Sequence, residues 1–298
     1  MKFAVITPAY NEENYIKHTL ESVAKQSLKP SSWIIVDDGS TDSTFELISE
    51  YAQDFSWIQA EKKPIKFNHQ AGAGVVQTFN YGLERLPFSN YDVIVKLDAD
   101  LTLPEDYFDR VAEEYRKDPK LGMCGGVCVV EENGEYVFES VADPDHLRGP
   151  IKSYRKACFE QIGQIRPIYG WDTLDELLAL YYGWNIKVLQ DLKVVHHRKT
   201  HSETKSLQIL LQSGRAFHTM GYGPFVALFS ALKQIKLPPA GLSSIVIYWG
   251  YLSAWFSFSE QAVSHDEAKF IRRYRYKRAF SKLTHAIGLG NKVMVNNN

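Results

Sequence analysis

Short apolar runs that alternate with helical patterns constrain the fold of this chain more than any other feature of its sequence. Three runs rich in Val and Ile occur at residues 3–7, 33–36 and 93–97. Between them, apolar residues recur at helix spacing, at residues 15–24, 45–51 and 75–83. Unbroken apolar runs of this length are typical of parallel strands buried on both faces, and strands that alternate with helices form open α/β sheets. We therefore predict a mostly parallel central sheet flanked by helices.

A hairpin is predicted where this alternation ends. Asn133-Gly134 suits a tight type I′ turn between apolar segments at 127–130 and 136–138, so the sheet becomes mixed there. A helix is expected at 172–182, and a strand follows at 186–195. We expect the first domain to close near residue 200.

The C-terminal third, residues 201–298, differs in composition and is predicted to be helical. Residues 237–259 carry no charge, and residues 269–282 carry seven basic side chains among aromatic ones. The uncharged stretch is long enough to cross a bilayer, but Pro238-Pro239 and its glycines make it a poor spanning segment. Two alternatives stay open: an in-plane or re-entrant helix whose basic neighbour contacts anionic lipid, or a hydrophobic helical pair folded onto the first domain.

Charge and cysteine usage exclude several classes of protein. Lys plus Arg (34) balances Asp plus Glu (35), so no net field favours nucleic acid as a partner. Cys124, Cys128 and Cys158 form no CxxC pair, which fits packing residues in a reducing compartment. The first apolar stretch is broken at Pro8 and is too short for the core of a signal peptide. We expect a cytoplasmic chain, and the membrane alternative would bring it to the inner face of the cytoplasmic membrane.

Polar clusters follow each of the three predicted strands. They are Tyr10-Asn11-Glu12, Asp37-Asp38-Gly39-Ser40 and Asp98-Ala99-Asp100. Ligands of open α/β sheets bind beyond the carboxyl ends of the strands, so these clusters should meet in one cleft. So many carboxylates in one cleft argue for a divalent cation, and Asp98-Ala99-Asp100 suits a metal that holds a diphosphate.

Four segments, in this order and spacing, resemble the inverting family 2 glycosyltransferases. They are VITPAYNEE (5–13), IIVDDGSTDST (34–44), FNYGL (79–83) and VKLDADL (95–101). The resemblance covers residues 1–200 and implies a GT-A fold, a nucleotide-diphosphate sugar donor and a divalent metal, Mn²⁺ or Mg²⁺. It implies that residues 1–101 bind the nucleotide sugar and that residues 102–200 form the acceptor side. By family habit the donor is a UDP-sugar, and the expected acceptor is a hydroxyl of a lipid-linked or surface-polysaccharide saccharide.

The resemblance also implies roles for single residues at the donor site. Tyr10 would lie against the nucleobase and Asp38 would accept a hydrogen bond from it, which suits the stacking of an aromatic face and the pairing of a carboxylate with an imide N–H. Glu12 would lie near the ribose, and Asp98 and Asp100 would bind ribose and metal. Pro8 and Gly72 complete the expected nucleotide site, and His196 or His197 would complete the metal shell or contact the diphosphate.

The acceptor side should supply a general base, because the acceptor hydroxyl must lose its proton as it attacks the anomeric carbon. Counting back from Gly183 aligns Asp172 with the family's base, with Asp175 and Glu176 in reserve. An ordinary helix cap is the alternative role for Asp172. The expected reaction is a single in-line displacement that inverts the anomeric configuration.

One departure from the family and three rival functions bear on this assignment. Many relatives carry a basic residue just before the asparagine that matches Asn80, whereas this chain has Thr78-Phe79, so diphosphate contacts are expected elsewhere, with Lys96 a candidate. TPAYNEE lacks the Gly-rich basic loop of a sugar nucleotidyltransferase, and Gly72-Ala73-Gly74 lacks the third glycine of a dehydrogenase fingerprint. A catalytically silent relative that binds sugar nucleotide or scaffolds a membrane complex stays the serious rival.

Overall fold

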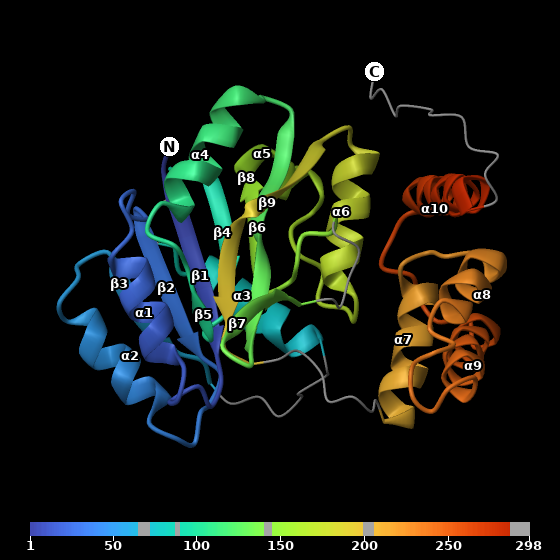
Figure 1. Ribbon diagram of the computed structural model, residues 1–298, viewed down its shortest axis with the longest axis horizontal. Coiled ribbons are helices and arrows are strands. Elements are labelled where there is room, and N and C mark those ends of the chain that lie inside the picture. Colours follow the sequence, from blue (N-terminus) through green and yellow to red (C-terminus); the bar gives the residue numbers. More distant parts are fainter. Residues whose placement is uncertain (65–71, 87–89, 140–144, 199–205, 287–298) are drawn as a thin grey trace. The chain divides into compact units, whose positions relative to one another are not determined.

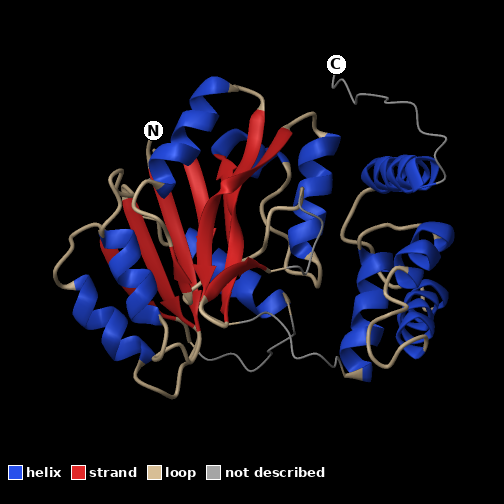
Figure 2. Ribbon diagram, viewed as in Figure 1, coloured by secondary structure: helices blue, strands red, loops and turns tan. Residues whose placement is uncertain are grey.

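The computed structural model describes residues 1–64, 72–86, 90–139, 145–198 and 206–286. The chain divides into two compact units, Met1–Ser202 and Glu203–Asn298. The first unit contains a mixed sheet with helices on both faces, and the described residues of the second are helical (Figures 1 and 2). The predicted α/β class, with a central sheet flanked by helices, is therefore confirmed. The prediction that the sheet is mostly parallel is wrong, because four of the eight strand pairings among the described residues are antiparallel.

The strands of the described residues form one sheet in the order β3-β2-β1-β4-β8-β6-β9-β5, with β7 paired to β6. They span Phe3–Ala9 (β1), Ser32–Asp37 (β2), Ile58–Lys62 (β3), Val93–Leu97 (β4), Leu101–Thr102 (β5), Leu121–Glu132 (β6), Glu135–Phe138 (β7), Ile151–Arg155 (β8) and Asn185–His196 (β9). β1 pairs in parallel with both β2 and β4, whereas β8 runs antiparallel between β4 and β6. The predicted hairpin is present, and Asn133 and Gly134 have the positive φ (53° and 82°) that a type I′ turn requires.

Helices cover both faces of the parallel strands. In the first unit they span Ile16–Ala24 (α1), Thr44–Ala52 (α2), Ala73–Leu83 (α3), Tyr107–Lys117 (α4), Lys156–Gln161 (α5) and Trp171–Tyr181 (α6). Phe3 and Val5 of β1 belong to the buried cluster that α1, α2 and α4 cover. On the opposite face α3 lies so close that a Cβ on Gly82 would be 2.7 Å from Cγ2 of Ile6. Burial on both faces explains the unbroken apolar runs in the sequence.

The sequence pattern does not predict β3 or β8. β3 is a short strand at the end of the sheet whose sequence, IQAEK, is largely polar. β8 has the sequence IKSYR, and its Lys152 is fully buried inside the first unit. A charged residue in a central strand runs against the pattern that identifies strands, since an ionised group is buried only when it is paired.

The second unit contains α7 (Leu207–Thr219), α8 (Pro224–Leu232), α9 (Leu242–Phe256) and α10 (His265–Ala286). The uncharged stretch at 237–259 therefore contributes one helix of 15 residues, preceded by turns that include the two prolines. Among the described residues, no helix combines the length and the apolar character needed to cross a membrane.

Candidate active site

A cleft of about 340 Å³ opens where β1, β2 and β4 end. Register explains its position, because Ala9 at the end of β1 pairs with Asp37 at the end of β2, and Ile6 pairs with Lys96 near the end of β4. The lining comes mainly from the segments that follow these strands and from the start of α3: Pro8, Ala9, Tyr10, Glu12, Asp38, Gly74, Val75, Thr78, Asp98, Ala99, Asp100 and Arg198. The structure thus brings together Pro8, Tyr10, Glu12, Asp38, Asp98 and Asp100, all singled out in the sequence.

Asp38 is paired with a cation that the sequence did not suggest. Nζ of Lys63, just beyond β3, donates to Oδ1 of Asp38 at 2.7 Å and to Oγ1 of Thr78 at 3.0 Å. Tyr10 is exposed beside this pair, in the same cleft. The cleft therefore offers an aromatic ring, which can stack on a base, and a carboxylate held by Lys63, which can pair with the polar edge of that base.

Three carboxylates crowd the other part of the cleft. Burial and the negative charge of Asp100 raise the pKa of Glu12 to about 7, although Arg198 counteracts them. Arg198 donates to Glu12 and, at 3.3 Å, to Oδ2 of Asp100. Within the described residues, Oε2 of Glu12 is buried with no hydrogen-bond partner. Burial also raises the pKa of Asp98, in spite of the neighbouring Lys96.

His196, the last residue of β9, joins this acidic cluster. Its Nε2 lies 3.3 Å from Oδ2 of Asp100 and its Nδ1 lies 3.1 Å from Oε2 of Glu139. Burial alone would lower the pKa of His196, but its hydrogen bonds to the two carboxylates raise that pKa to about 9. His197 points elsewhere, with its Nε2 2.8 Å from Oγ1 of Thr102 and its ring stacked on His18. Of the two histidines, His196 is the one that faces the carboxylates.

The side-chain oxygens in the cleft are suitable ligands for a hard divalent cation. Glu12, Asp98 and Asp100 supply carboxylate oxygens, which Mn²⁺ and Mg²⁺ prefer, and one of these oxygens has no protein partner. Glu139 would hold the His196 ring through Nδ1, as carboxylates commonly do for metal-binding histidines. Nowhere in the described part of the chain do three or more His, Cys, Asp or Glu side chains form a ready-made metal cluster. Oxygens of a bound diphosphate would therefore have to complete the coordination.

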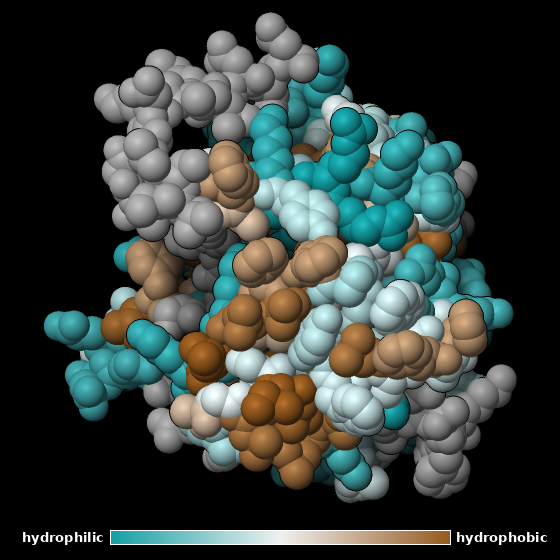
Figure 3. Space-filling model, turned by 90° about the vertical axis from the view of Figure 1, so that its right-hand side faces the viewer, coloured by the Kyte–Doolittle hydropathy of each residue, from teal (hydrophilic) through white to brown (hydrophobic). Residues whose placement is uncertain are grey.

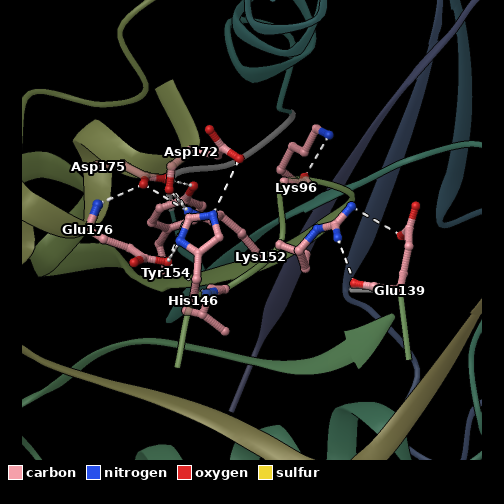
Figure 4. Close-up of polar contacts among 11 residues, drawn as sticks. Lys96, Glu139, His146, Lys152, Tyr154, Asp172, Asp175 and Glu176 are labelled. Atoms are coloured by element: carbon pink, nitrogen blue, oxygen red, sulfur yellow. Dashed lines mark hydrogen bonds and ion pairs between the residues drawn. The ribbon is translucent and has the colours of Figure 1, made fainter. Parts of the chain in front are cut away.

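A second polar cluster lies at the start of α6 (Figure 4). Its carboxylates come from Asp172, Asp175 and Glu176, and its cations from His146 and from Lys152 of β8. The imidazole of His146 is held between two of them, with Nε2 3.5 Å from Asp172 and Nδ1 3.0 Å from Glu176. Helix α6 begins after Gly170, whose φ is +80°, so Asp172 is a first-turn residue rather than the helix cap.

Exposure separates the three carboxylates of α6. The Asp172 side chain is 34% exposed, against 15% for Glu176 and 2% for Asp175. Asp175 is bound by Nζ of Lys152 at 2.8 Å and by the hydroxyl of Tyr154 at 2.5 Å. Asp172 is therefore the member of the cluster that an acceptor could reach, whereas Asp175 is enclosed by its partners.

The same contacts set the pKa values of the cluster. Burial raises the pKa of Asp172, but the hydrogen bond from His146 and the charge of Lys152 outweigh it and bring that pKa to about 2. Burial raises the pKa of Asp175 to about 6, although Lys152 opposes it. Hydrogen bonds to Asp172 and Glu176 raise the pKa of His146 to about 9 against the effect of burial. Asp172 is consequently ionised at neutral pH and able to accept a proton.

Lys96 links the two clusters instead of facing the cleft. Its Nζ donates to Asp98 and, at 2.8 Å, to the carbonyl oxygen of Gly149, and it lies 5.2 Å from the centre of the Trp171 ring. Lys96 is buried, so the structure does not favour it as a diphosphate ligand. Gly72 precedes α3 with φ +78° and approaches Tyr169, beside the residues of α3 that line the cleft.

Five residues of these clusters were not singled out as site residues in the sequence: Lys63, Glu139, His146, Lys152 and Arg198. A partial signal exists for Arg198, because it follows the two histidines directly. The others reach the site from β3, β8 and loops that approach it only in the folded chain.

His146 should make stability depend on pH. Its pKa is about 9 in the folded chain against 6.5 ordinarily, so its contribution is full below about pH 6.5 and is lost as the pH rises through 9. We expect His146→Gln to flatten part of the decline in unfolding free energy between these pH values in urea titrations. His265→Gln, at an exposed position at the start of α10, serves as the control. If the unfolding free energy declined with pH at the same slope in wild type and His146→Gln, the ion pairs of His146 with Asp172 and Glu176 would be contradicted.

Comparison with known proteins identifies a family and several relatives. The family model described as glycosyl transferase family 2 matches residues 4–165. The putative glycosyltransferase EpsH of Bacillus subtilis is 27% identical over 171 residues, 57% of this chain and 46% of the relative. Poly-beta-1,6-N-acetyl-D-glucosamine synthase of Staphylococcus epidermidis is 30% identical over 119 residues, 39% of this chain and 26% of the relative. The matches therefore cover less than half the length of these relatives.

Solved structures of transferases share the fold. S. aureus TarS 1–349 in complex with UDP-GlcNAc matches with a TM-score of 0.57 at 18% identity, covering 96% of this chain and 81% of TarS 1–349. The mannosyltransferase PcManGT from Pyrobaculum calidifontis, in complex with GDP-Man and Mn²⁺, matches with a TM-score of 0.54 at 18% identity, covering 96% of this chain and 82% of that one. At these identities the likeness concerns the fold alone.

Proposed function

The chain belongs to glycosyl transferase family 2, whose model matches more than half of it, and from this premise we propose that it transfers a sugar from a UDP-sugar to a hydroxyl of a saccharide acceptor. It is a glycosyltransferase with a GT-A fold. The observation that carries the proposal is the cleft at the ends of β1, β2 and β4, because it gathers an aromatic ring and four carboxylates at the place where α/β sheets bind nucleotides.

We assign the donor to this cleft. Tyr10 stacks on the base and Asp38, held by Lys63, pairs with its edge. Glu12 lies by the ribose, with Asp98 beside it. A divalent metal at Asp100 and His196 would neutralise the diphosphate as it departs, and the imidazole must give up its Nε2 proton to bind it. Arg198 takes the place expected of a basic diphosphate ligand, since it lines the cleft and is half exposed.

Asp172 is the proposed general base. As the acceptor oxygen forms its bond to the anomeric carbon, the bond from that carbon to the diphosphate oxygen breaks and the hydroxyl proton passes to the Asp172 carboxylate. Attack from the side opposite the leaving group inverts the anomeric configuration. His146 holds the carboxylate in place and Lys152 anchors the backbone beneath it, through the carbonyl oxygen of Asp172.

We infer the classes of donor and acceptor from the ligands and names of the relatives. TarS binds UDP and UDP-GlcNAc, and the synthase of S. epidermidis is named for poly-beta-1,6-N-acetyl-D-glucosamine, so we propose a UDP-sugar and a polysaccharide or lipid-linked saccharide acceptor. Such an acceptor would be met at the inner face of the cytoplasmic membrane. PcManGT binds GDP-Man, so GDP is the competing nucleotide that the experiment must include.

Asp100→Ala should weaken metal-dependent UDP binding by more than about tenfold, because one metal-binding carboxylate is lost and His196 keeps only Glu139 of its two carboxylate partners. We would titrate UDP and GDP, each with and without Mn²⁺, into wild type, Asp100→Ala and the control Glu105→Ala, whose side chain is exposed in the same stretch of chain. Tight binding of UDP that requires Mn²⁺ and survives only in the control is the expected result. Failure of both nucleotides to bind wild type would favour the catalytically silent scaffold.

A further inference from the structure

Helices α8 and α9 of the second unit carry their large apolar residues on the exposed side. On α9, Leu242, Ile245, Trp249 and Phe256 are exposed at helical spacing, with Ile245 at 67% and Trp249 at 63%. On α8 the exposed residues are Phe225, Phe229 and Leu232, again at helical spacing. The space-filling view shows apolar residues gathered on this side of the molecule (Figure 3). Exposed apolar residues that lie this close together indicate a contact surface, whereas single exposed apolar residues are normal on any protein surface.

The protein-facing side of the same helices is made largely of small residues. α9 buries Ser243, Ser244, Gly250 and Ala254 beside two larger residues, Ile247 and Tyr251, and α8 buries Ala227 and Ala231 beside Val226. α7 and α9 lie so close that a Cβ on Gly250 would be 2.3 Å from the carbonyl oxygen of Leu211. A helix in water normally turns its large apolar residues inward. Small residues between helices and large ones outward are instead the arrangement of helices that meet lipid.

Length limits how such helices can meet a bilayer. α9 has 15 residues, or about 22 Å, which is short of the roughly 30 Å hydrocarbon core. Helices of this size can lie in the interface with their apolar side among the outer parts of the acyl chains.

Helix α10 adds positive charge to the same unit. Lys269, Arg273 and Lys277 are exposed on one stripe of the helix, together with the aromatic rings of Tyr276 and Phe280. The opposite side is held by the protein, since Ile271 is buried and Arg272 donates to the carbonyl oxygen of Gly221. Residues 203–298 contain twelve Lys and Arg but four Asp and Glu, in a chain that is close to neutral overall. Basic and aromatic residues together suit anionic head groups and the interface below them.

We propose that α8 and α9 lie in the interface of an anionic lipid bilayer, with the basic stripe of α10 on the lipid phosphates. An apolar side and an excess of basic residues in one unit together suit an anionic bilayer, whereas a protein partner would have to offer both an apolar and an acidic surface. The inference goes beyond the proposed transfer reaction and uses residues of the second unit alone. Membrane binding and UDP binding can therefore fail independently.

The test is flotation of the full-length chain with vesicles of phosphatidylglycerol and phosphatidylcholine, compared with phosphatidylcholine alone. Wild type should float with the anionic vesicles and release as salt is raised. Lys269→Gln/Arg273→Gln/Lys277→Gln should bind about 100-fold more weakly, because each basic residue near the surface contributes about fivefold. Ile245→Ser/Trp249→Ser and, on α8, Phe225→Ser/Phe229→Ser should each weaken binding by more than about tenfold.

Matched variants of the first unit provide the controls. Tyr136→Ser/Phe138→Ser removes two exposed aromatic residues, and Lys25→Gln/Lys117→Gln removes two exposed basic ones. UDP titration of every variant shows that the first unit is intact. Equal binding to both kinds of vesicle, equal loss in the controls, or no binding at all by wild type would overturn the proposal. It would also be overturned if Ile245→Ser/Trp249→Ser converted an oligomer to a monomer without changing vesicle binding, because the apolar side would then belong to a second copy.

Discussion

Asp172→Asn should lower kcat by about 10² to 10⁴-fold while UDP binding stays within twofold of wild type. A positioned general base contributes an acceleration of this size, and the amide cannot accept the proton of the acceptor hydroxyl. The substitution keeps the shape of the side chain, and Asp172 is not among the residues that line the donor cleft. Turnover of UDP-sugar with acceptor and calorimetric titration of UDP would separate the two effects.

A helix-terminus effect is the competing explanation for such a loss. Asp172 lies in the first turn of α6, where any carboxylate interacts favourably with the helix dipole. Glu46→Gln, an exposed acidic residue in the first turn of α2, removes the same kind of interaction away from the site. If Asp172→Asn lowered the melting temperature as Glu46→Gln does but left kcat unchanged, Asp172 would be a structural residue.

The position of the cleft at the ends of β1, β2 and β4 could be predicted from the sequence, because its carboxylates follow strands that the sequence itself reveals. Parallel strands end at one edge of the sheet, so Glu12, Asp38 and Asp100 had to lie near one another once β1, β2 and β4 were recognised. The registers of β1 with β2 and of β1 with β4 then determine how far each residue lies along the sheet. The apolar runs that mark the strands, and the rule that ligands bind at the carboxyl ends of parallel strands, suffice to predict this part of the site.

The partners of those residues could not be predicted in the same way. His146 meets Asp172 across 26 residues, and Arg198 meets Glu12 across 186. These pairs depend on the antiparallel pairing of β8 with β4 and of β9 with β5. A repeat of apolar residues every 2 or 3.6 positions does not reveal which strands pair. The side chains that set the pKa values of Asp172 and Glu12 are therefore specified by tertiary structure.

In the second unit, too, the sequence does not show which side chains are exposed. The sequence shows that residues 237–259 are uncharged, but only the helix positions of α9 separate Ile245 and Trp249, which are exposed, from Ser244 and Gly250, which are buried. Composition alone left membrane contact and packing on the first domain as open alternatives. The direction of the large side chains is the new information from the structure.

Lys152→Met should lower the free energy of unfolding by about 3–5 kcal/mol at pH 8, the usual cost of removing one partner from a buried ion pair. Lys152 is fully buried, and its ammonium group binds Asp175, the backbone at Asp172 and, at 3.5 Å, Glu176. The variant leaves the buried carboxylate of Asp175 without its cation, whereas Glu176 keeps its ion pair with His146. Urea unfolding of wild type, Lys152→Met and the exposed-site control Lys25→Met would measure the difference.

The pH dependence of this loss distinguishes a lost charge from lost packing. The pKa of Asp175 is about 6 with Lys152 present, and removing the cation should raise it further. Below that pKa the carboxyl group takes up a proton and no longer needs a counter-charge, so the destabilisation should shrink as the pH falls from 8 to 5. Lys152→Met/Asp175→Asn should likewise recover part of the loss at pH 8, because Tyr154 can still donate to the amide oxygen. A destabilisation that is constant with pH and unrelieved in the double variant would mean that Lys152 acts through the packing of its buried side chain, not through its charge.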